Sequence, residues 1–219
     1  MKKCLVVGAG GHCRALLSIL QEQGDAYDIV GIVDLQPLRG KETILGVEVV
    51  GTIADLPRFK ESGVTALFLA LGDNAERARH YRLAKELGFE LPNLIAPGAY
   101  LAASATIGEA NLICHRCHLG PVSRIGNGNI LNTGSVLEHE STVDDFCHLA
   151  PLSVISGRSH LGSQVFLGVN GTVIDKVKVC DRVIIGAGSV VVKDITGEDA
   201  TYVGVPARSL AAAGGPKQH

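Results

Sequence analysis

The fold is decided by residues 101–196, which divide into hexads that read LAASAT IGEANL ICHRCH LGPVSR IGNGNI LNTGSV LEHEST VDDFCH LAPLSV ISGRSH LGSQVF LGVNGT VIDKVK VCDRVI IGAGSV VVKDIT. The first residue of all sixteen hexads is Leu, Ile or Val. An amphipathic helix repeats its apolar residues every three or four positions, and a half-buried strand every second one. A period of six fits neither element and is typical of a hexapeptide β-helix.

Three hexads build one triangular coil of 18 residues, and successive coils stack at the strand spacing of roughly 4.8 Å. The aliphatic residue that opens each hexad points inward and fills a continuous core. The small residues that are common at the fifth position suit the narrow space beside each corner. The stretch is long enough for about five coils. Because no insertion interrupts the register, any site must be built from the faces and corners of this prism.

Length and composition limit the possible functions. The 219 residues suffice for one or two domains with a full core. The net charge is −2 without a basic run, so neither nucleic acid nor a membrane is expected as a partner. The start MKKCLVVGAGG predicts a first strand rather than a signal peptide, and no apolar run matches a membrane span. Six cysteines without a secretory segment indicate reduced thiols and a cytoplasmic location.

The residues before the hexads alternate between short apolar runs and helical patterns. Strands are predicted over 4–8, 29–34, 47–50 and 66–71, and helices over 12–23 and 75–87. This alternation is typical of a small parallel βαβ sheet. The sequence therefore predicts an α/β plus all-β chain with a Rossmann-like domain over 1–96, a β-helix domain over 97–210 and a disordered tail over 211–219.

A glycine-rich turn follows the first predicted strand. Residues 8–11 read Gly-Ala-Gly-Gly and precede a helix, where backbone N–H groups can hold a phosphate. Asp34 ends the second strand, where a carboxylate can accept ribose hydroxyls. The third glycine of the dinucleotide fingerprint is replaced by Cys13, which favours a mononucleotide group over NAD. The glycines could form only a tight turn, but Asp34 and the Gly-Asp-Asn sequence at 72–74 favour a nucleotide site at the carboxyl edge.

The richest chemistry of the hexads lies around His139. This histidine is the third residue of its hexad, an outward or corner position, and Glu138 and Glu140 flank it. A carboxylate beside one imidazole nitrogen fixes the tautomer and raises the basicity of the other nitrogen. The arrangement suits a general base that takes a proton from an attacking amine or hydroxyl. The alternative is an exposed surface histidine without a role.

Other histidines and cysteines carry weaker signals. His148 ends a hexad nine residues after His139 and either approaches a ligand at a subunit boundary or packs. The stretch 114–118 reads Cys-His-Arg-Cys-His and matches a haem attachment motif, but it lies in register within the hexads. The hexapeptide prism also hosts γ-type carbonic anhydrases, which use two histidines five residues apart. No such pair occurs here, so no metal is predicted.

Taken together, the motifs strongly resemble those of bacterial nucleotide-sugar acetyltransferases of the hexapeptide-repeat superfamily, the PglD/NeuD type, over nearly the full length. The order and spacing of the motifs carry this resemblance. They are Gly8-Ala9-Gly10-Gly11-His12, Leu71-Gly72-Asp73-Asn74 with Arg77, Leu131-Asn132-Thr133, Glu138-His139-Glu140, Phe146-Cys147-His148-Leu149-Ala150-Pro151, Ile185-Gly186-Ala187-Gly188-Ser189-Val190-Val191 and Gly204-Val205-Pro206-Ala207.

The resemblance implies a left-handed β-helix, a homotrimer with active sites at subunit interfaces, and two substrates. The first domain would hold the nucleotide of a UDP- or GDP-linked sugar, and acetyl-CoA would lie along the prism. His139 falls on the family's general base and Glu140 on its orienting acid. The residues expected to contact acetyl-CoA are His148, Gly168 and Gly186. Those expected to contact the nucleotide sugar are Gly10, Gly11, His12, Asp34, Gly72, Asn74, Asn132 and Glu138.

The predicted activity is direct acetyl transfer from acetyl-CoA to the amine of a nucleotide-linked sugar in surface glycan or glycoprotein biosynthesis. A UDP-linked 4-amino-4,6-dideoxyhexose is the expected acceptor, because an amine matches the family members that are most alike. Three alternatives stay open at this point: O-acetylation of sialic acid or another sugar, a metalloenzyme of the γ-carbonic-anhydrase kind, and a scaffold without catalysis.

Overall fold

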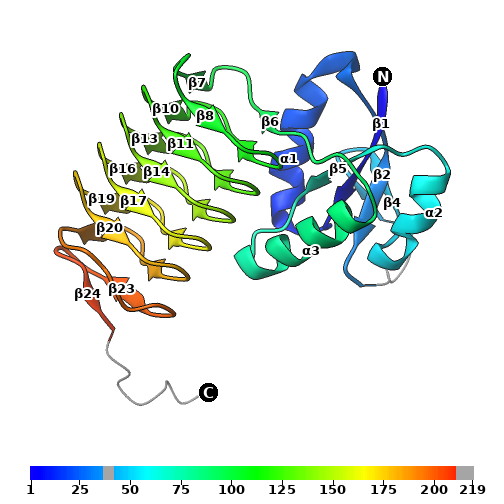
Figure 1. Cartoon of the computed structure of the whole chain (residues 1–219). Helices are drawn as coiled ribbons and strands as arrows, with labels where there is room; N and C mark the ends of the chain where they lie inside the picture. The colour runs from blue at the N-terminus through cyan, green and yellow to red at the C-terminus, as the bar shows by residue number, and fades with distance from the viewer. Residues whose placement is uncertain (37–41, 211–219) are drawn as a thin grey trace.

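The computed structural model describes residues 1–36 and 42–210, so the tail predicted over 211–219 lies outside the described residues. The described chain forms a small α/β unit beside a triangular prism of stacked coils (Figure 1). No helix within these ranges combines the length and apolar character that a bilayer span requires.

The prism is made of two-residue strands in three parallel sheets, which we call faces 1, 2 and 3. Face 1 contains β7 Tyr100–Leu101, β10 His118–Leu119, β13 Val136–Leu137, β16 Val154–Ile155, β19 Thr172–Val173 and β22 Val190–Val191. Face 2 contains β8 Thr106–Ile107, β11 Arg124–Ile125, β14 Thr142–Val143, β17 His160–Leu161 and β20 Lys178–Val179. Face 3 contains β6 Leu94–Ile95, β9 Leu112–Ile113, β12 Ile130–Leu131, β15 His148–Leu149, β18 Phe166–Leu167 and β21 Ile184–Ile185, and ends in β23 Thr201–Val203 and the antiparallel β24 Arg208–Ser209.

The register of the prism confirms the predicted coil of 18 residues. Leu119 pairs with Leu101 on one side and with Leu137 on the other, and each hexad strand pairs in the same way. From Ile113 onward every residue that opens a hexad is buried. The aliphatic stack therefore supplies the continuous core that the period of six predicts, and the fold class is confirmed.

The three edges of the prism are built from turns that we name by the faces they join. Corner A joins faces 1 and 2 (120–123, 138–141, 156–159 and their equivalents), corner B joins faces 2 and 3 (126–129, 144–147, 162–165), and corner C joins faces 3 and 1 (132–135, 150–153, 168–171). The fourth residue of most hexads has a left-handed φ of 55° to 62°, as in Glu140 and Arg158. This conformation is unfavourable for ordinary residues, and here it turns the chain at each corner.

The fifth hexad position is not limited to the small residues that suit the narrow interior. It holds small residues such as Ser141, whose Oγ donates to the Glu138 carbonyl at 2.6 Å, but also asparagine and valine. The Asn111 side chain accepts from the Asn129 N–H at 2.8 Å, and the Asn129 side chain accepts from the Cys147 N–H at 2.7 Å. The interior beside corner B thus accepts an amide because the next coil supplies its hydrogen bond.

The α/β unit is a five-stranded sheet with the order β3-β4-β2-β1-β5. Its strands are β1 Lys2–Val7, β2 Tyr27–Asp34, β3 Thr43–Ile44, β4 Val47–Thr52 and β5 Ala66–Leu69, and all pairs are parallel except β3 with β4. Its helices are α1 Gly11–Glu22, α2 Leu56–Glu61 and α3 Asn74–Glu86, with single 3₁₀ turns at Gly24–Ala26 and Ile53–Asp55. The strands β1, β2, β4 and β5 and the helices α1 and α3 match the predicted elements within a few residues, whereas β3 was not predicted.

The α/β unit and the prism share one apolar core. Leu16 and Leu20 of α1 belong to the same buried cluster as Leu94 and Ile113 of face 3. β6 pairs with β9, so the chain already lies in face 3 before the predicted junction. This packing fixes the carboxyl edge of the small sheet against corner B and face 3, which is where the clefts lie.

Candidate active site

A wide cleft opens at the carboxyl ends of β1, β2 and β5. We call it the first cleft; it measures about 540 Å³ and is lined by residues 8–12, 34–36, 70–73 and Glu76. The carboxyl edge of a parallel sheet is the usual ligand position in open α/β folds. The structure therefore brings together five predicted nucleotide-sugar contacts: Gly10, Gly11, His12, Asp34 and Gly72.

The glycines of the turn differ in whether the fold requires them. A Cβ on Gly8 would lie 2.8 Å from Leu71 Cδ2 and 3.1 Å from the Ala70 oxygen, and its φ is +103°, so the fold itself requires glycine. At Gly10 and Gly11 an added Cβ would meet no atom within 4 Å. Gly10 is the N-cap of α1 and offers no side-chain cap. The first turn of α1 thus presents backbone N–H groups to open space, which is the geometry of an anion site.

Asp34 ends β2 at the rim of the first cleft. Its Oδ1 accepts a hydrogen bond from the Ala9 N–H at 3.1 Å and thereby holds the glycine turn. Within the described residues its Oδ2 has no hydrogen-bond partner. One carboxylate oxygen thus has a structural role, and the other is placed where the sequence predicts a ribose contact.

Two histidines meet where the α/β unit touches the prism. The ring centroids of His12 and His148 lie 5.7 Å apart, and Phe166 packs edge-on against His148 at 5.2 Å. Nδ1 of His148 lies 3.3 Å from the Gly72 carbonyl oxygen, to which it donates when protonated. Within the described chain the Nε2 atoms of both rings are buried without a partner. Burial first, and then the charge of Arg77, lowers the pKa of each ring to about 4, so both are neutral near pH 7.

A second cleft of about 510 Å³ continues from the first across Gly72 and Asp73 toward face 3. Phe166 and Ile184 form its apolar part. Asn74 lines this cleft and not the first one; its Nδ2 donates to the Gln164 oxygen at 3.0 Å, and its Oδ1 accepts from Arg77 at 2.7 Å. Both ends of the Asn74 amide are therefore already bonded within the chain.

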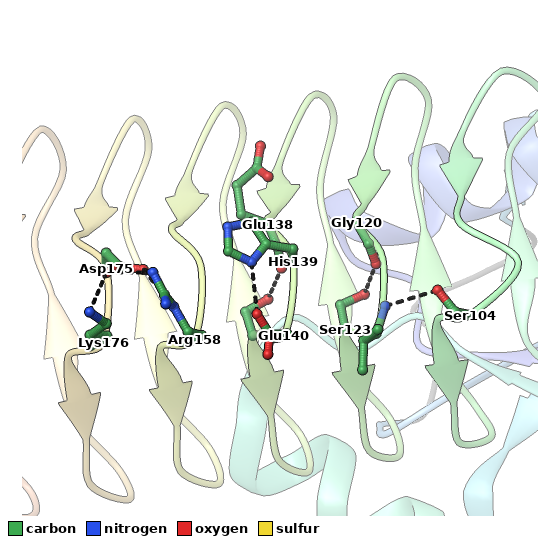
Figure 2. A network of polar contacts seen from close by, with 11 residues as sticks. Ser104, Gly120, Ser123, Glu138, His139, Glu140, Arg158, Asp175 and Lys176 are labelled. Atoms are coloured by element: carbon green, nitrogen blue, oxygen red, sulfur yellow. Dashed lines mark hydrogen bonds and ion pairs between the residues drawn. The ribbon is translucent and has the colours of Figure 1, made fainter.

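His139 lies at corner A, on an edge of the prism that the α/β unit does not cover (Figure 2). Its side chain is 48% exposed, and Nδ1 lies 3.2 Å from Oε2 of Glu140. With the proton on Nδ1, Nε2 carries the lone pair and is free to act as a base. Figure 2 shows the Glu138 carboxylate directed away from Glu140. The predicted pairing of an imidazole with one flanking acid is thus present.

The next coil shapes the space around the imidazole. A Cβ on Gly157 would lie 2.6 Å from both Cε1 and Nε2 of His139, so only glycine leaves room for this ring orientation. The Gly157 oxygen accepts from the Lys176 N–H, while its own N–H has no acceptor in the described chain. The glycine that packs against the histidine ring therefore keeps, among the described residues, an unpaired backbone donor.

Corner C holds the other predicted residues of the prism. Asn132 folds back on itself, because its Oδ1 accepts from the Thr133 N–H at 2.8 Å. Gly168 and Gly186 have packing reasons: added Cβ atoms would lie 2.6 Å from the Ala187 nitrogen and 2.8 Å from Val203 Cγ1. The close stacking of coils therefore explains both glycines, and contact with acetyl-CoA stays a prediction.

Within one chain the predicted residues form separate groups. The cleft residues and His148 lie together at corner B and face 3, His139 and Glu140 lie at corner A, and Asn132 lies at corner C. Neither cleft is lined by His139. Across the described ranges no three His, Cys, Asp or Glu side chains gather as potential metal ligands. Cys114 and Cys117 are buried in the core.

Two residues with clear structural roles were not predicted as site residues. Gly157 is visible in the sequence only as the residue 18 positions after His139. Arg77 was part of a family motif but was given no role. A cation near the start of a helix interacts unfavourably with the helix dipole, so its presence there implies a stabilising contact elsewhere. The 18-residue period and this misplaced charge are the signals that could have identified them.

Comparison with solved structures and family profiles agrees with this architecture. The PglD N-terminal domain family matches residues 3–83. Perosamine N-acetyltransferase from Caulobacter crescentus, solved with CoA and GDP-perosamine, is 35% identical with a TM-score of 0.90, and the match covers 95% of this chain and 97% of that one. The acetyltransferase domain of PglB from Neisseria gonorrhoeae FA1090, in complex with acetyl coenzyme A, is 31% identical with a TM-score of 0.87 and 95% and 99% coverage.

Curated relatives match mainly over shorter segments. Serine acetyltransferase from Synechococcus elongatus is 32% identical over 100 residues, which is 41% of each chain. Acyl-[acyl-carrier-protein]--UDP-N-acetylglucosamine O-acyltransferase from Pseudomonas fluorescens is 35% identical over 74 residues, 34% of this chain and 28% of that one. The chain thus spans less than half the length of these curated relatives.

A small parallel sheet with a cleft at its carboxyl edge, joined to a left-handed hexapeptide prism, is the architecture of the acetyltransferases that this chain matches. Within that class the chain belongs to the sugar acetyltransferases of the hexapeptide-repeat family, because the identity and coverage extend over both units. The family predicted from the motifs is confirmed.

Proposed function

We propose that the chain is an acetyl-CoA-dependent N-acetyltransferase that acts on a nucleotide-linked amino sugar. The observation that carries this proposal is the full-length likeness to an N-acetyltransferase solved with CoA and GDP-perosamine, together with the His139–Glu140 pair. Residues 1–96 would bind the nucleotide sugar, and residues 97–210 would bind acetyl-CoA and perform the chemistry.

The nucleotide sugar would bind in the first cleft. The diphosphate would accept hydrogen bonds from the N–H groups at the start of α1, where Gly10 and Gly11 leave open space. Asp34 would bind the ribose through its remaining carboxylate oxygen, and the buried Nε2 of His12 would hydrogen-bond to the ligand. The support for this proposal is that polar atoms without hydrogen-bond partners in the described chain and free backbone N–H groups lie around one cleft.

The chemical step would be direct transfer between two bound substrates. Nε2 of His139 would remove a proton from the sugar amine as its nitrogen attacks the thioester carbonyl, and Glu140 would stabilise the imidazolium. The C–S bond then breaks, and the proton passes to the CoA thiolate. The Gly157 N–H, unpaired in the described chain, would donate to the oxyanion. A covalent acetyl-enzyme is not required, because the amine is itself the nucleophile.

The active site would form between copies of the chain in a homotrimer. His139 lies away from both clefts of its own chain, so a neighbour must supply the cleft that faces it. Exposed apolar side chains at corners A and C support such contacts: Val122 is 49% exposed, Leu152 53% and Val169 47%. Asn132 at corner C would then border the acceptor pocket, with Glu138 on the opposite side.

The acceptor would be a 4-amino-4,6-dideoxyhexose linked to UDP, as the motifs predict, and the GDP-perosamine complex makes the GDP-linked sugar the natural competitor. The test is a panel of UDP- and GDP-linked amino sugars with acetyl-CoA, in which release of free thiol is followed. Transfer to an amino sugar with a kcat/KM well above that for its hydroxyl analogue is expected. No thiol release with any nucleotide amino sugar would refute the proposed function.

A substitution of Gly10 separates nucleotide binding from folding. The φ of −71° and the open space allow an aspartate, which is a preferred N-cap, so Gly10→Asp should fold well. Its carboxylate would take the N–H groups meant for the diphosphate and repel that anion. We expect KM for the nucleotide sugar to rise about 10–100-fold, the equivalent of about 1.5–3 kcal/mol for a charge-assisted hydrogen bond, with little change in kcat.

The matched control is Gly10→Ser, which caps the helix without a charge. Steady-state kinetics with varied nucleotide sugar measure both variants. An unchanged KM in Gly10→Asp would mean that the diphosphate does not bind at this helix N-terminus.

A further inference from the structure

Arg77 is the most completely bonded cation of the described chain. It lies on α3, is 1% exposed, and forms no ion pair with a carboxylate in the described residues. Burial of a charge is costly unless hydrogen bonds replace its hydration. Here every nitrogen of the guanidinium donates within the protein. Burial lowers the pKa of Arg77 to about 10, so the side chain is still charged near pH 7.

The acceptors of Arg77 come from both structural units. In the α/β unit, Nη1 donates to the carbonyl oxygens of residues 71, 72 and 73 at 2.9–3.3 Å. In the prism, Nε donates to the Gly128 oxygen at 2.6 Å, and Nη2 donates to the oxygens of Phe146 and Cys147 at 3.0 and 3.1 Å. One planar fork therefore joins the loop after β5 to corner B of two successive coils.

The loop that Arg77 holds borders both clefts and contacts His148. Gly72 and Asp73 line both clefts. The Gly72 carbonyl, which accepts from Arg77, is also the partner of Nδ1 of His148. That contact selects the tautomer with the proton on Nδ1 and leaves the buried Nε2 of His148 as a hydrogen-bond acceptor.

We propose that Arg77 is a positioning residue that locks the Gly72 loop onto the prism and thereby fixes the His148 ring with its Nε2 as a hydrogen-bond acceptor at the junction of the two units. This inference rests on the proposed function, since it gives the junction a role in binding acetyl-CoA and the nucleotide sugar. The groups that face His148 are Arg77 from α3, His12 from α1, the Gly72 carbonyl from the loop and Phe166 from face 3. Arg77 is the only one of these with a permanent charge.

The test compares Arg77→Gln, which removes the charge and the fork, with Arg77→Lys, which keeps the charge and loses the fork. Arg82→Gln on the exposed side of the same helix is the matched control. In Arg77→Gln we expect KM for both substrates to rise at least about tenfold, because both clefts share the released loop, while kcat falls less. In Arg77→Lys we expect a similar rise in KM.

A second readout needs no substrate. The pKa of His148, followed by NMR of isotope-labelled histidine and assigned with His148→Gln, is expected to rise in Arg77→Gln and to stay low in Arg77→Lys, because a nearby cation disfavours the imidazolium. A folded Arg77→Gln with wild-type KM values and an unchanged His148 pKa would overturn the proposal. If Arg77→Gln does not fold, wild-type KM values in Arg77→Lys would overturn it. Absence of acetyl transfer in the wild type would refute the proposed function and leave the His148 measurement as the test of Arg77.

Discussion

Replacement of His139 by alanine is expected to lower kcat about 10²–10⁴-fold, the usual contribution of a general base, and to leave both KM values nearly unchanged. The physical reason is that Nε2 of His139 acts on the proton that leaves the amine in the transition state, while the half-exposed ring adds little to ground-state binding. Steady-state kinetics at saturating acetyl-CoA, with the nucleotide sugar varied, measure this directly.

His160 is the matched control for this variant. It is also a partly exposed prism histidine with an acidic partner, since its Nε2 lies 2.9 Å from Oδ2 of Asp144, but it lies on face 2 away from corner A. His160→Ala should retain wild-type kinetics. Near wild-type kcat in His139→Ala would remove the acid-paired histidine from the mechanism, even if the chain acetylates sugars.

The prism was predictable from the sequence because one residue type in six decides it. An aliphatic residue at the start of each hexad, buried from Ile113 onward, leaves no alternative register, as the pairing of Leu119 with Leu137 shows. The fifth position was predicted less well. A period fixes which side chains point inward but not how a polar one is satisfied, and Asn129 is buried only because Cys147 of the next coil donates to it.

In the candidate site, too, the residues placed by a repeating pattern could be predicted, and those placed by distant contacts could not. The first cleft could be predicted, because the carboxyl ends of consecutive parallel strands must meet, and this brought residues 8–12 and Asp34 together. The charge of Arg77 near a helix start and the position of Gly157 one coil after His139 mark both residues as unusual, but neither signal says what the residue contacts. The partners of Arg77 lie 51 and 70 residues away, and the contact of Gly157 with the His139 ring exists only once the coils are stacked.

In the proposed homotrimer, two impaired variants should partly restore activity when they are combined. If each site combines His139 of one copy with the first cleft of its neighbour, His139→Ala and Gly10→Asp chains complement each other. In trimers assembled at random from equal amounts, about a quarter of the sites pair an intact histidine with an intact cleft. At a nucleotide-sugar concentration well below the wild-type KM, we expect about a quarter of the wild-type rate, compared with about 1–10% for Gly10→Asp alone and about 1% or less for His139→Ala alone.

The experiment distinguishes shared sites from single-chain sites and assumes only that each chain contacts a neighbour on both sides in a closed ring. If each chain built its whole site alone, every chain in the mixture would carry one lesion, and co-expression would restore nothing. Folded trimers mixed without subunit exchange are the matched control and should show only the mean of the two variants' own rates. A mixture whose rate does not rise above that mean after verified exchange would place His139 and the first cleft of the same chain in one site, which the separation of corner A from both clefts argues against.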